Sequence, residues 1–193
     1  MMRKWLVVLI LLVGSLSAFA VEGKDESREN RELVYKVDIK DEIGPSIWRL
    51  VKRSFDRATD ENADVILVHM NTYGGMVVYA DSLRSLILNY PKPVWVFIDN
   101  NAASAGALIS IACDRIYMRE GANIGAATVV NQTGDAMPDK YQSYMRSMIR
   151  ATAQAHGKDT VMENGQSVIR WKRDPRIAEA MVDERVVVEG GNG

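Results

Sequence analysis

The segment 94–112 reads V-W-V-F-I-D-N-N-A-A-S-A-G-A-L-I-S-I-A and places Ser104 in a run of alanine and glycine. An apolar strand-like run, 94–98, precedes this serine, and an apolar helix-like run, 107–112, follows it. A serine at a strand-to-helix junction exposes its hydroxyl beside unpaired backbone N–H groups, which can stabilise charge on a nearby oxygen. Ser104 is therefore a candidate nucleophile, although the commonest role of a serine at a helix start is to cap the helix.

Strand-like and helix-like segments alternate on both sides of this junction. Apolar runs predict strands at 33–39, 64–70, 94–99 and 115–118. Helical spacing of apolar residues predicts the connecting helices at 45–58, 76–89 and 104–112. In the first helix we expect one buried stripe made of Ile47, Leu50, Val51 and Phe55. The order strand, helix, strand, helix predicts an α/β fold with mostly parallel strands and flanking helices.

The remainder of the chain departs from this simple alternation. Pro138 opens a long predicted helix that runs to about His156. The pair Asn164-Gly165 predicts a tight hairpin within a surface insertion at 159–171. A short helix is expected at 175–181, and residues 186–188 look like a strand. We found no internal repeat in the sequence.

Composition restricts the class of protein. The chain has 193 residues, of which 47% are hydrophobic and 25% charged, which suits one globular domain. Its formal net charge is −1 and its lysines and arginines are dispersed, so the sequence gives no sign of nucleic-acid binding. The single cysteine, Cys113, permits neither an intrachain disulfide nor a thiolate metal site, and we expect a core residue there. No metal and no cofactor are predicted.

The N-terminus carries an export pattern. Residues 1–20 combine a short basic region, an apolar run of about a dozen residues and the small-x-small sequence Ala18-Phe19-Ala20, as in a secretory signal. The apolar run is shorter than the roughly 20 residues of a membrane span, so an uncleaved anchor is the second interpretation. Residues 21–32 then form a polar linker, and 33–193 the folded domain. We expect a periplasmic or extracytoplasmic location.

A second candidate element is the turn N-T-Y-G-G at 71–75, which follows the predicted strand 64–70. Ligands of open α/β sheets bind at the carboxyl ends of the strands, where Ser104 also lies. Paired glycines present N–H groups with no Cβ in the way, which suits an oxyanion hole formed by the N–H groups of Gly75 and Ala105. A plain turn before a helix is the alternative interpretation of the two glycines.

The chain offers two histidines and several lysines as candidate general bases. His69 lies in a predicted strand, where we expect a core histidine hydrogen-bonded to backbone. His156 ends the long helix, where we expect a surface cation that complements the helix dipole. A lysine accepts the proton of a serine only as the neutral amine, which requires burial to lower its pKa. Lys140, beside Tyr141 at the start of the long helix, is such a candidate, with a solvated lysine as the alternative.

Four ordered motifs resemble the Clp protease/crotonase superfamily and, more narrowly, the membrane-associated serine proteases of the NfeD family, relatives of signal peptide peptidase A. They are N-T-Y-G-G at 71–75, A-A-S-A-G at 102–106, G-A-N-I-G-A-A at 121–127 and M-P-D-K-Y at 137–141. The resemblance runs from about Leu33 to Val182. It implies a Clp/crotonase-like fold and a Ser–Lys dyad of Ser104 and Lys140, with the glycine turn supplying the oxyanion hole.

The resemblance also implies a substrate class and partners. It predicts an exported or membrane-associated serine endopeptidase that cleaves apolar segments of membrane proteins through an acyl-enzyme. Gly74, Tyr73 and Ala126 would contact the substrate, a stomatin-type membrane protein is an implied partner, and a homodimer or larger homo-oligomer is expected. Longer family members continue into membrane helices and a small β-barrel, so we expect a short form or a fragment.

Two departures and two alternatives accompany this prediction. Tyr73 replaces the proline usual in the family's turn. The histidine that Clp peptidases carry in the segment matching 123–128 is absent, which favours a lysine base. A non-catalytic, membrane-associated scaffold would keep the fold and need neither Ser104 nor Lys140. A crotonase-type acyl-CoA enzyme would need a Glu or Asp acid/base, and the segment 121–127 contains none.

Overall fold

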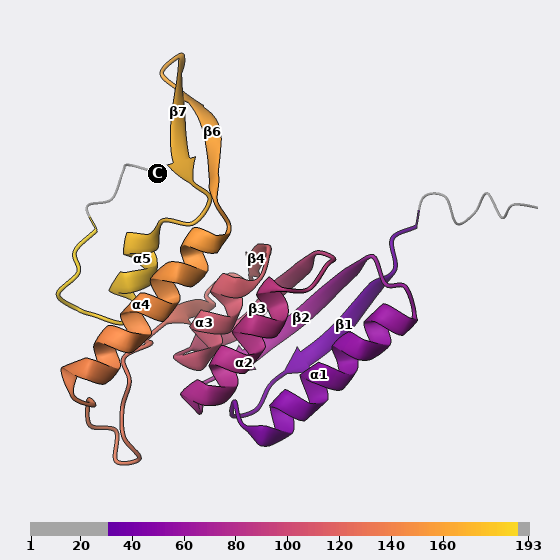
Figure 1. Ribbon diagram of the computed structural model, residues 1–193, viewed down its shortest axis with the longest axis horizontal. Helices are drawn as coiled ribbons and strands as arrows, with labels where there is room; N and C mark the ends of the chain where they lie inside the picture. Colours follow the sequence, from indigo (N-terminus) through magenta and orange to yellow (C-terminus); the bar gives the residue numbers. More distant parts are fainter. Residues whose placement is uncertain (1–30, 189–193) are drawn as a thin grey trace, which may run out of the picture. The chain divides into compact units, whose positions relative to one another are not determined.

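A computed structural model describes residues 31–188, and Figure 1 shows their elements in chain order. The five helices and seven strands of this described part are β1 (Val34–Ile39), α1 (Pro45–Asp60), β2 (Val65–Thr72), α2 (Val77–Leu88), β3 (Val94–Ala103), α3 (Ala105–Ala112), β4 (Arg115–Met118), β5 (Asn123–Gly125), α4 (Asp139–Ala155), β6 (Lys158–Glu163), β7 (Gln166–Trp171) and α5 (Pro175–Ala180). Every helix predicted within this part is present, as are the predicted strands up to residue 118 and the hairpin.

The main sheet has the strand order β1-β2-β3-β4, with every neighbouring pair parallel. One row of the register runs Val37, Val68, Val96, Ile116 across the four strands. Helices α1, α2 and α3 lie along one face of this sheet (Figure 1). The predicted α/β fold with mostly parallel strands and flanking helices is therefore confirmed. Strand β5, which pairs with the end of β3, was not predicted, because three residues are too few for a periodic signal.

The core lies between this sheet face and the helices. In α1 the buried apolar residues are Ile47, Val51, Phe55 and Ala58. Leu50, which we expected in the same stripe, is 41% exposed, so that part of the prediction is wrong. Residues at i, i+4, i+8 and i+11 follow one narrow row along the helix, and Leu50 lies at the edge of the row. Each large apolar side chain that is fully buried contributes about 1.5–3 kcal/mol.

The carboxyl ends of β2 and β3 lie side by side and set up the candidate site. Strand β3 continues to Ala103, several residues beyond the predicted end, so that Ser104 follows the strand directly. Strand β2 extends to Thr72, which pairs with Ala102 after an irregularity in register between Met70 and Thr72. The glycine turn and the serine therefore leave the sheet at adjacent positions on the same edge.

The C-terminal part of the described chain contains an antiparallel hairpin and a short helix. Strands β6 and β7 pair from Lys158 opposite Trp171 to Glu163 opposite Gln166, which confirms the hairpin. Its turn residues Asn164 and Gly165 have φ of 48° and 79°, as a type I′ turn requires.

The strand expected at 186–188 is absent, and that prediction is wrong. The N–H of Val186 donates to the carbonyl of Asp183, which closes a turn, and no strand edge pairs with these residues. Apolar β-branched residues form a strand only where a partner edge is available.

The predicted signal sequence, 1–20, lies outside the described residues, as does most of the linker at 21–32. Between residues 31 and 188, no helix has the length and apolar character needed to cross a bilayer.

Candidate active site

Ser104 occupies the position immediately before α3, where a capping residue would stand. Its backbone has φ 54° and ψ −115°, a conformation that non-glycine residues rarely adopt. The hydroxyl caps no backbone N–H and has no hydrogen-bond partner among residues 31–188. The backbone alone is anchored, because the Ser104 N–H donates to the carbonyl of Gly125 at 2.7 Å. The capping role considered from the sequence is therefore wrong, and the half-buried hydroxyl is unused by the fold.

Gly74 lies directly against this serine. A Cβ added to Gly74 would be 2.7 Å from Ser104 Cβ and 3.2 Å from Ser104 Oγ. Thr72, which is buried, holds the turn: its hydroxyl donates to the Asp41 carbonyl at 2.8 Å and accepts the Gly74 N–H at 3.2 Å. Only glycine fits this position, since the neighbouring side chain fills the space and φ is 114°. The sequence motif contains Thr72 but gives no sign of this role.

Gly75 is fixed by pairing with the segment before α1. The Ile43 N–H donates to Gly74 O, and the Met76 N–H donates to Ile43 O, both at 2.8 Å. These bonds engage the carbonyl of Gly74 and the N–H of Met76, the residues before and after Gly75. The N–H of Gly75 itself makes no hydrogen bond within the described part of the chain. Ala105 begins α3, so its N–H has no partner in a preceding turn. Two backbone donors are thus available near Ser104.

A small cavity of about 60 Å³ brings these groups together. Ser104, Gly75 and Ala105 line it with apolar residues from α2, α4 and the segment after β5, namely Val77, Ala80, Ala127, Val129, Val130 and Met145. Polar donors in an apolar enclosure exert a stronger field than the same donors in water. One cavity is thus lined by a serine and by two residues whose N–H groups are unpaired in the described part of the chain.

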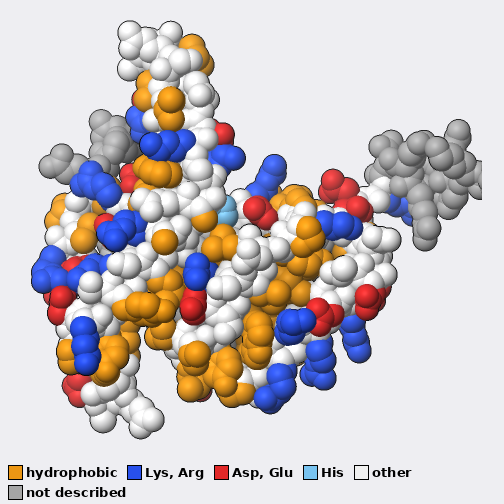
Figure 2. Space-filling view, in the orientation of Figure 1, with side chains coloured by type: hydrophobic (Ala, Val, Ile, Leu, Met, Phe, Trp, Pro, Cys, Tyr) orange, Lys and Arg blue, Asp and Glu red, His pale blue; other side chains and the backbone are white. Residues whose placement is uncertain are grey.

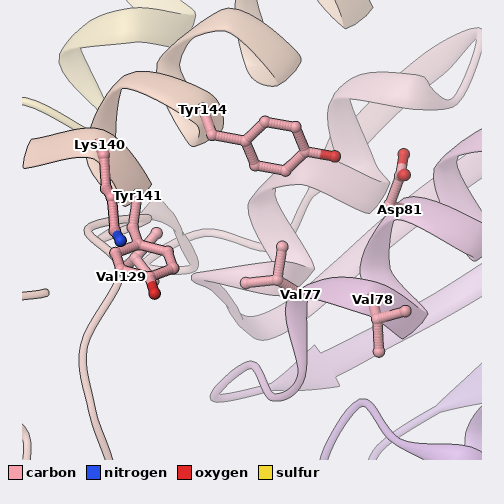
Figure 3. A pocket seen from close by; sticks show the side chains of 7 residues that line it. All are labelled: Val77, Val78, Asp81, Val129, Lys140, Tyr141 and Tyr144. Atoms are coloured by element: carbon pink, nitrogen blue, oxygen red, sulfur yellow. The ribbon is translucent and has the colours of Figure 1, made fainter.

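Lys140 lines a second, larger cavity of about 550 Å³, the α2/α4 groove. Figure 3 shows its lining side chains: Val77, Val78, Asp81, Val129, Lys140, Tyr141 and Tyr144. Val77 and Val129 belong to both cavities, so the two are neighbours. The exposed Lys140 ammonium lies 4.9 Å from the centroid of the Tyr141 ring, and no hydrogen bond joins it to Ser104. In this conformation the two residues of the predicted dyad are not hydrogen-bonded and line different cavities.

The remaining candidate substrate contacts lie at the surface near the cavities. Tyr73 is 83% exposed at the tip of the glycine turn. Ala126 is exposed with φ 50°, next to Ala127 in the wall of the small cavity. The N–H of Ala127 donates to Met181 O at 2.7 Å, which ties this wall to the residues after α5.

A buried glutamine, which sequence reasoning did not single out, holds the wall between the two cavities. Gln142 Oε1 accepts the Val129 N–H at 2.9 Å, and its Nε2 donates to the carbonyls of Val129 at 2.7 Å and Met137 at 3.0 Å. The sequence does contain a signal for this role: Gln142 lies three residues before Met145, on the buried row of α4. A polar residue in an apolar row has to satisfy its amide through contacts that the sequence does not specify.

His69 contacts two carboxylates and no backbone group, so the expectation of a backbone-bonded core histidine is wrong. Its Nδ1 lies 2.9 Å from Asp38 Oδ1, and its Nε2 lies 3.4 Å from Asp99 Oδ2. The register explains this contact, because Asp38 pairs with His69 across β1 and β2, and Asp99 lies two residues after its β3 neighbour Phe97. His69 does not line the Ser104 cavity.

His156 ends α4 as expected but is not a solvated cation. Its Nε2 lies 2.8 Å from the carbonyl oxygen of Ile111 and 3.0 Å from Arg173 Nη1. Burial, together with the positive charge of Arg173, lowers the pKa of His156 below its ordinary value. Neither histidine contributes to the candidate site, which leaves Lys140 as the candidate base in the groove.

Parallel strands with helices on one face, and a serine at their carboxyl edge, define a protein with the Clp protease/crotonase-like fold. A lysine-to-alanine variant of the 1510-N membrane-bound stomatin-specific protease, solved with a substrate peptide, is similar with a TM-score of 0.67 at 24% identity, covering 80% of this chain and 68% of that chain. ClpP1 from Listeria monocytogenes has a TM-score of 0.54 at 16% identity, covering 77% of this chain and 88% of its own. An enoyl-CoA hydratase from Mycobacterium marinum has a TM-score of 0.50 at 17% identity, covering 78% of this chain and 72% of that chain.

The chain belongs to the family described as "NfeD1b, N-terminal domain", which matches residues 33–192. Membrane protein NfeD1b of Bacillus subtilis (strain 168) is 31% identical over 157 residues, covering 81% of this chain and 32% of the relative. Membrane-bound protease PH1510 of Pyrococcus horikoshii is 26% identical over 172 residues, covering 83% of this chain and 36% of the relative. The chain is thus related to a membrane-bound protease and spans about a third of the length of these curated relatives.

Proposed function

We propose that this domain is a serine endopeptidase in which Ser104 is the nucleophile and Lys140 the general base. The observation that supports this most strongly is the backbone of Ser104, held at φ 54° while its hydroxyl bonds to nothing in residues 31–188. Strained backbone at a strand-to-helix turn costs about 1–3 kcal/mol and is concentrated at functional sites. Strain that exposes a nucleophile is typical of hydrolases with a serine on such a turn.

The proposed reaction proceeds through an acyl-enzyme. The neutral amine of Lys140 takes the hydroxyl proton of Ser104 as Oγ bonds to the scissile carbonyl carbon. The N–H groups of Gly75 and Ala105 then hold the negative oxygen of the tetrahedral intermediate. Lys140 returns its proton to the leaving amine as the C–N bond breaks, and a water molecule hydrolyses the ester to free Ser104.

The proposal requires Lys140 to move. Its side chain has to rotate from above the Tyr141 ring into the neighbouring Ser104 cavity, past the shared wall of Val77 and Val129. An apolar substrate side chain in the α2/α4 groove would exclude water from the lysine and promote this movement.

The substrate proposed is an apolar segment of a membrane protein. The α2/α4 groove presents two valines from α2 and the rings of Tyr141 and Tyr144, of which Tyr144 is 58% exposed. The exposed turn residues Tyr73 and Gly74, with Ala126, would contact the substrate backbone beside Ser104. Because the relative PH1510 acts in its 1510-N form as a stomatin-specific protease, a stomatin-type protein is the proposed partner. We further propose export to the extracytoplasmic face of the membrane and a homo-oligomer.

The test is hydrolysis of a fluorogenic apolar peptide by four matched variants of the full chain. Ser104→Ala and Lys140→Ala should each abolish turnover. Ser143→Ala on the exposed side of α4 and Lys52→Ala on α1 should retain it, since neither side chain lines the Ser104 cavity or the α2/α4 groove. Circular dichroism confirms that each variant is folded.

Two outcomes would reject the proposal. Turnover unchanged in Ser104→Ala would exclude this serine as the nucleophile. No turnover of any apolar peptide by the wild-type chain would favour the non-catalytic scaffold. An acyl-CoA reaction has little support, because Asp81, the carboxylate among the residues that line the groove, is already paired with Arg84 at 2.6 Å.

A further inference from the structure

A third cavity, the basic cleft, lies at the base of the β6–β7 hairpin and is distinct from the candidate active site. It has a volume of about 400 Å³, and its lining residues are Asp114, Arg115, Ile116, Tyr117, His156, Lys172 and Arg173. Three basic side chains, those of Arg115, Lys172 and Arg173, therefore line the cleft together with one carboxylate. That carboxylate is partly satisfied, since Asp114 Oδ2 accepts the Val94 N–H at 2.8 Å. The cleft carries an excess of positive charge, although the chain as a whole has a net charge of −1.

The cations of the cleft have donors to spare. Arg173 donates to the carbonyl of Ile111 through one nitrogen, which fixes its guanidinium at the cleft wall. Lys172 is about half exposed, and the nearest carboxylate oxygen, on Asp159, is 3.7 Å from its Nζ, a loose contact. Arg115 is exposed, and within residues 31–188 its guanidinium makes one long hydrogen bond, to the Tyr117 hydroxyl at 3.5 Å. A phosphoryl oxygen entering here would find charged donors on several sides.

Two tryptophans, each with a cation over its ring, flank the cleft. Arg115 lies 5.3 Å from the ring centroid of Trp95, and Lys158 lies 4.3 Å from that of Trp171. Trp171 directly precedes Lys172 of the cleft. Tryptophan and tyrosine rings beside lysine and arginine are typical of protein surfaces at the headgroup level of a bilayer. The combination of aromatic and cationic groups therefore indicates that the cleft binds a lipid surface and not a free ion.

The hairpin itself supplies exposed apolar contacts. Figure 1 shows it projecting from the end of α4, and Figure 2 shows hydrophobic side chains along it. Met162 and Ile169 are each 69% exposed, and Trp171 is 37% exposed. An isolated two-stranded hairpin gains little stability in water, so such side chains are better explained by a surface that they bind.

We propose that the basic cleft and the hairpin form a docking site for an anionic membrane surface, with the cleft taking a phospholipid headgroup phosphate. The site and the α2/α4 groove lie at opposite ends of α4, because Lys140 is in its first turn and His156 follows its last residue. Seventeen helical residues span about 25 Å. A chain docked in this way holds the groove away from the lipid, where it meets segments that emerge from the membrane.

The experiment is vesicle co-sedimentation of the full chain, comparing phosphatidylcholine vesicles with vesicles that also contain phosphatidylglycerol. The apolar run near the N-terminus adds the same background to every variant, so the preference for phosphatidylglycerol is the readout. Replacing Arg115 and Lys172 together by glutamine should reduce this preference by about fivefold for each charge removed. A control with the same charge change, Lys52→Gln with Arg53→Gln on α1, should keep it. Met162→Ser with Ile169→Ser should weaken binding to both kinds of vesicle.

Four results would overturn the proposal or its assignment of the hairpin. The first is equal binding of the wild-type chain to both kinds of vesicle, and the second is an equal loss in the α1 control. The third is a shift of the His156 ring resonances by inorganic phosphate without any preference for phosphatidylglycerol, which would assign the cleft to a soluble phosphate. A hairpin variant that changes the oligomeric state but leaves vesicle binding intact would assign the hairpin to a second copy of the chain.

Discussion

The Ser104 cavity and the α2/α4 groove adjoin each other but are built in different ways. Backbone groups form the first: the Ser104 N–H is bonded to Gly125, and the two glycines of the turn are paired with Ile43. Side chains form the second, and its lysine and tyrosines lie at the exposed start of α4. The half that would hold the oxyanion is rigid, whereas the half that would supply the base is able to adjust.

This contrast gives the proposed mechanism a physical basis. Preorganised N–H groups cost no reorganisation when charge develops, so a fixed oxyanion hole favours catalysis. A lysine that is solvated at rest and moves inward with substrate would limit hydrolysis to proteins that fill the groove. Substitutions confined to one half therefore separate the two contributions.

The largest effect is expected at the movable half. Lys140→Met keeps an unbranched stem of four heavy atoms but removes the amine. It should lower the rate of peptide hydrolysis by about 10²–10⁴-fold, as expected for loss of a general base. The stability should change little, because Lys140 is exposed. Steady-state rates measured beside Lys52→Met check this, and equal rates for the two variants would remove Lys140 from the mechanism.

A change to the rigid half should cost nearly as much. Gly74→Ala places a Cβ 2.7 Å from that of Ser104, where no real contact is that short, so the serine has to shift. A displacement of about 1 Å can lower a rate about 100-fold. Gly134→Ala is the matched control, since Gly134 also has positive φ, 88°, but no heavy atom lies within 4 Å of an added Cβ. If the two variants lose activity equally, backbone strain and not the contact with Ser104 explains the loss.

A smaller effect is expected at the wall between the halves. Gln142→Leu leaves the Val129 N–H and the Met137 carbonyl without partners, whereas the Val129 carbonyl keeps the Met137 N–H at 2.9 Å. The two lost partners should cost about 1–3 kcal/mol in the free energy of unfolding. Urea denaturation measures this cost. Gln154→Leu, an exposed position on the same helix, should cost far less, and a similar loss there would attribute the effect to helix composition.

The smallest effect concerns pH and the end of α4 far from the groove. The pKa of His156 is lowered in the folded state, so the unfolded chain binds its proton more readily, and the stabilisation is lost as the pH falls below about 6.5. His156→Gln should flatten the decline in the free energy of unfolding over this range. The difference in slope cannot exceed about 1.4 kcal/mol per pH unit, the limit for one proton. Parallel pH profiles for the two proteins would contradict the lowered pKa.

The sequence predicted the fold well because its strands are apolar runs with clear boundaries. The strands at 34–39 and 115–118 and the hairpin turn at Asn164 follow from local patterns that tertiary contacts do not override. Leu50 shows the limit of such patterns, since the width of a buried stripe depends on how the helix lies on the sheet.

Contacts distant in sequence could not be predicted. The partners of His69 come from β1 and β3, and those of His156 are Ile111 and Arg173, which no local spacing brings together. For the candidate site, short motifs indicated Ser104, Gly74 and Gly75, which the fold does place side by side. The position of Lys140 depends on the loop that Gln142 holds, and no motif encodes that geometry.

Reaction with a serine-directed fluorophosphonate, followed by intact mass and peptide mapping, determines whether Ser104 is the nucleophile. One adduct per chain is expected, on Ser104, absent in Ser104→Ala and formed more slowly in Lys140→Met. An adduct that persists in Ser104→Ala, or a wild-type chain that remains unlabelled, would contradict this role of Ser104.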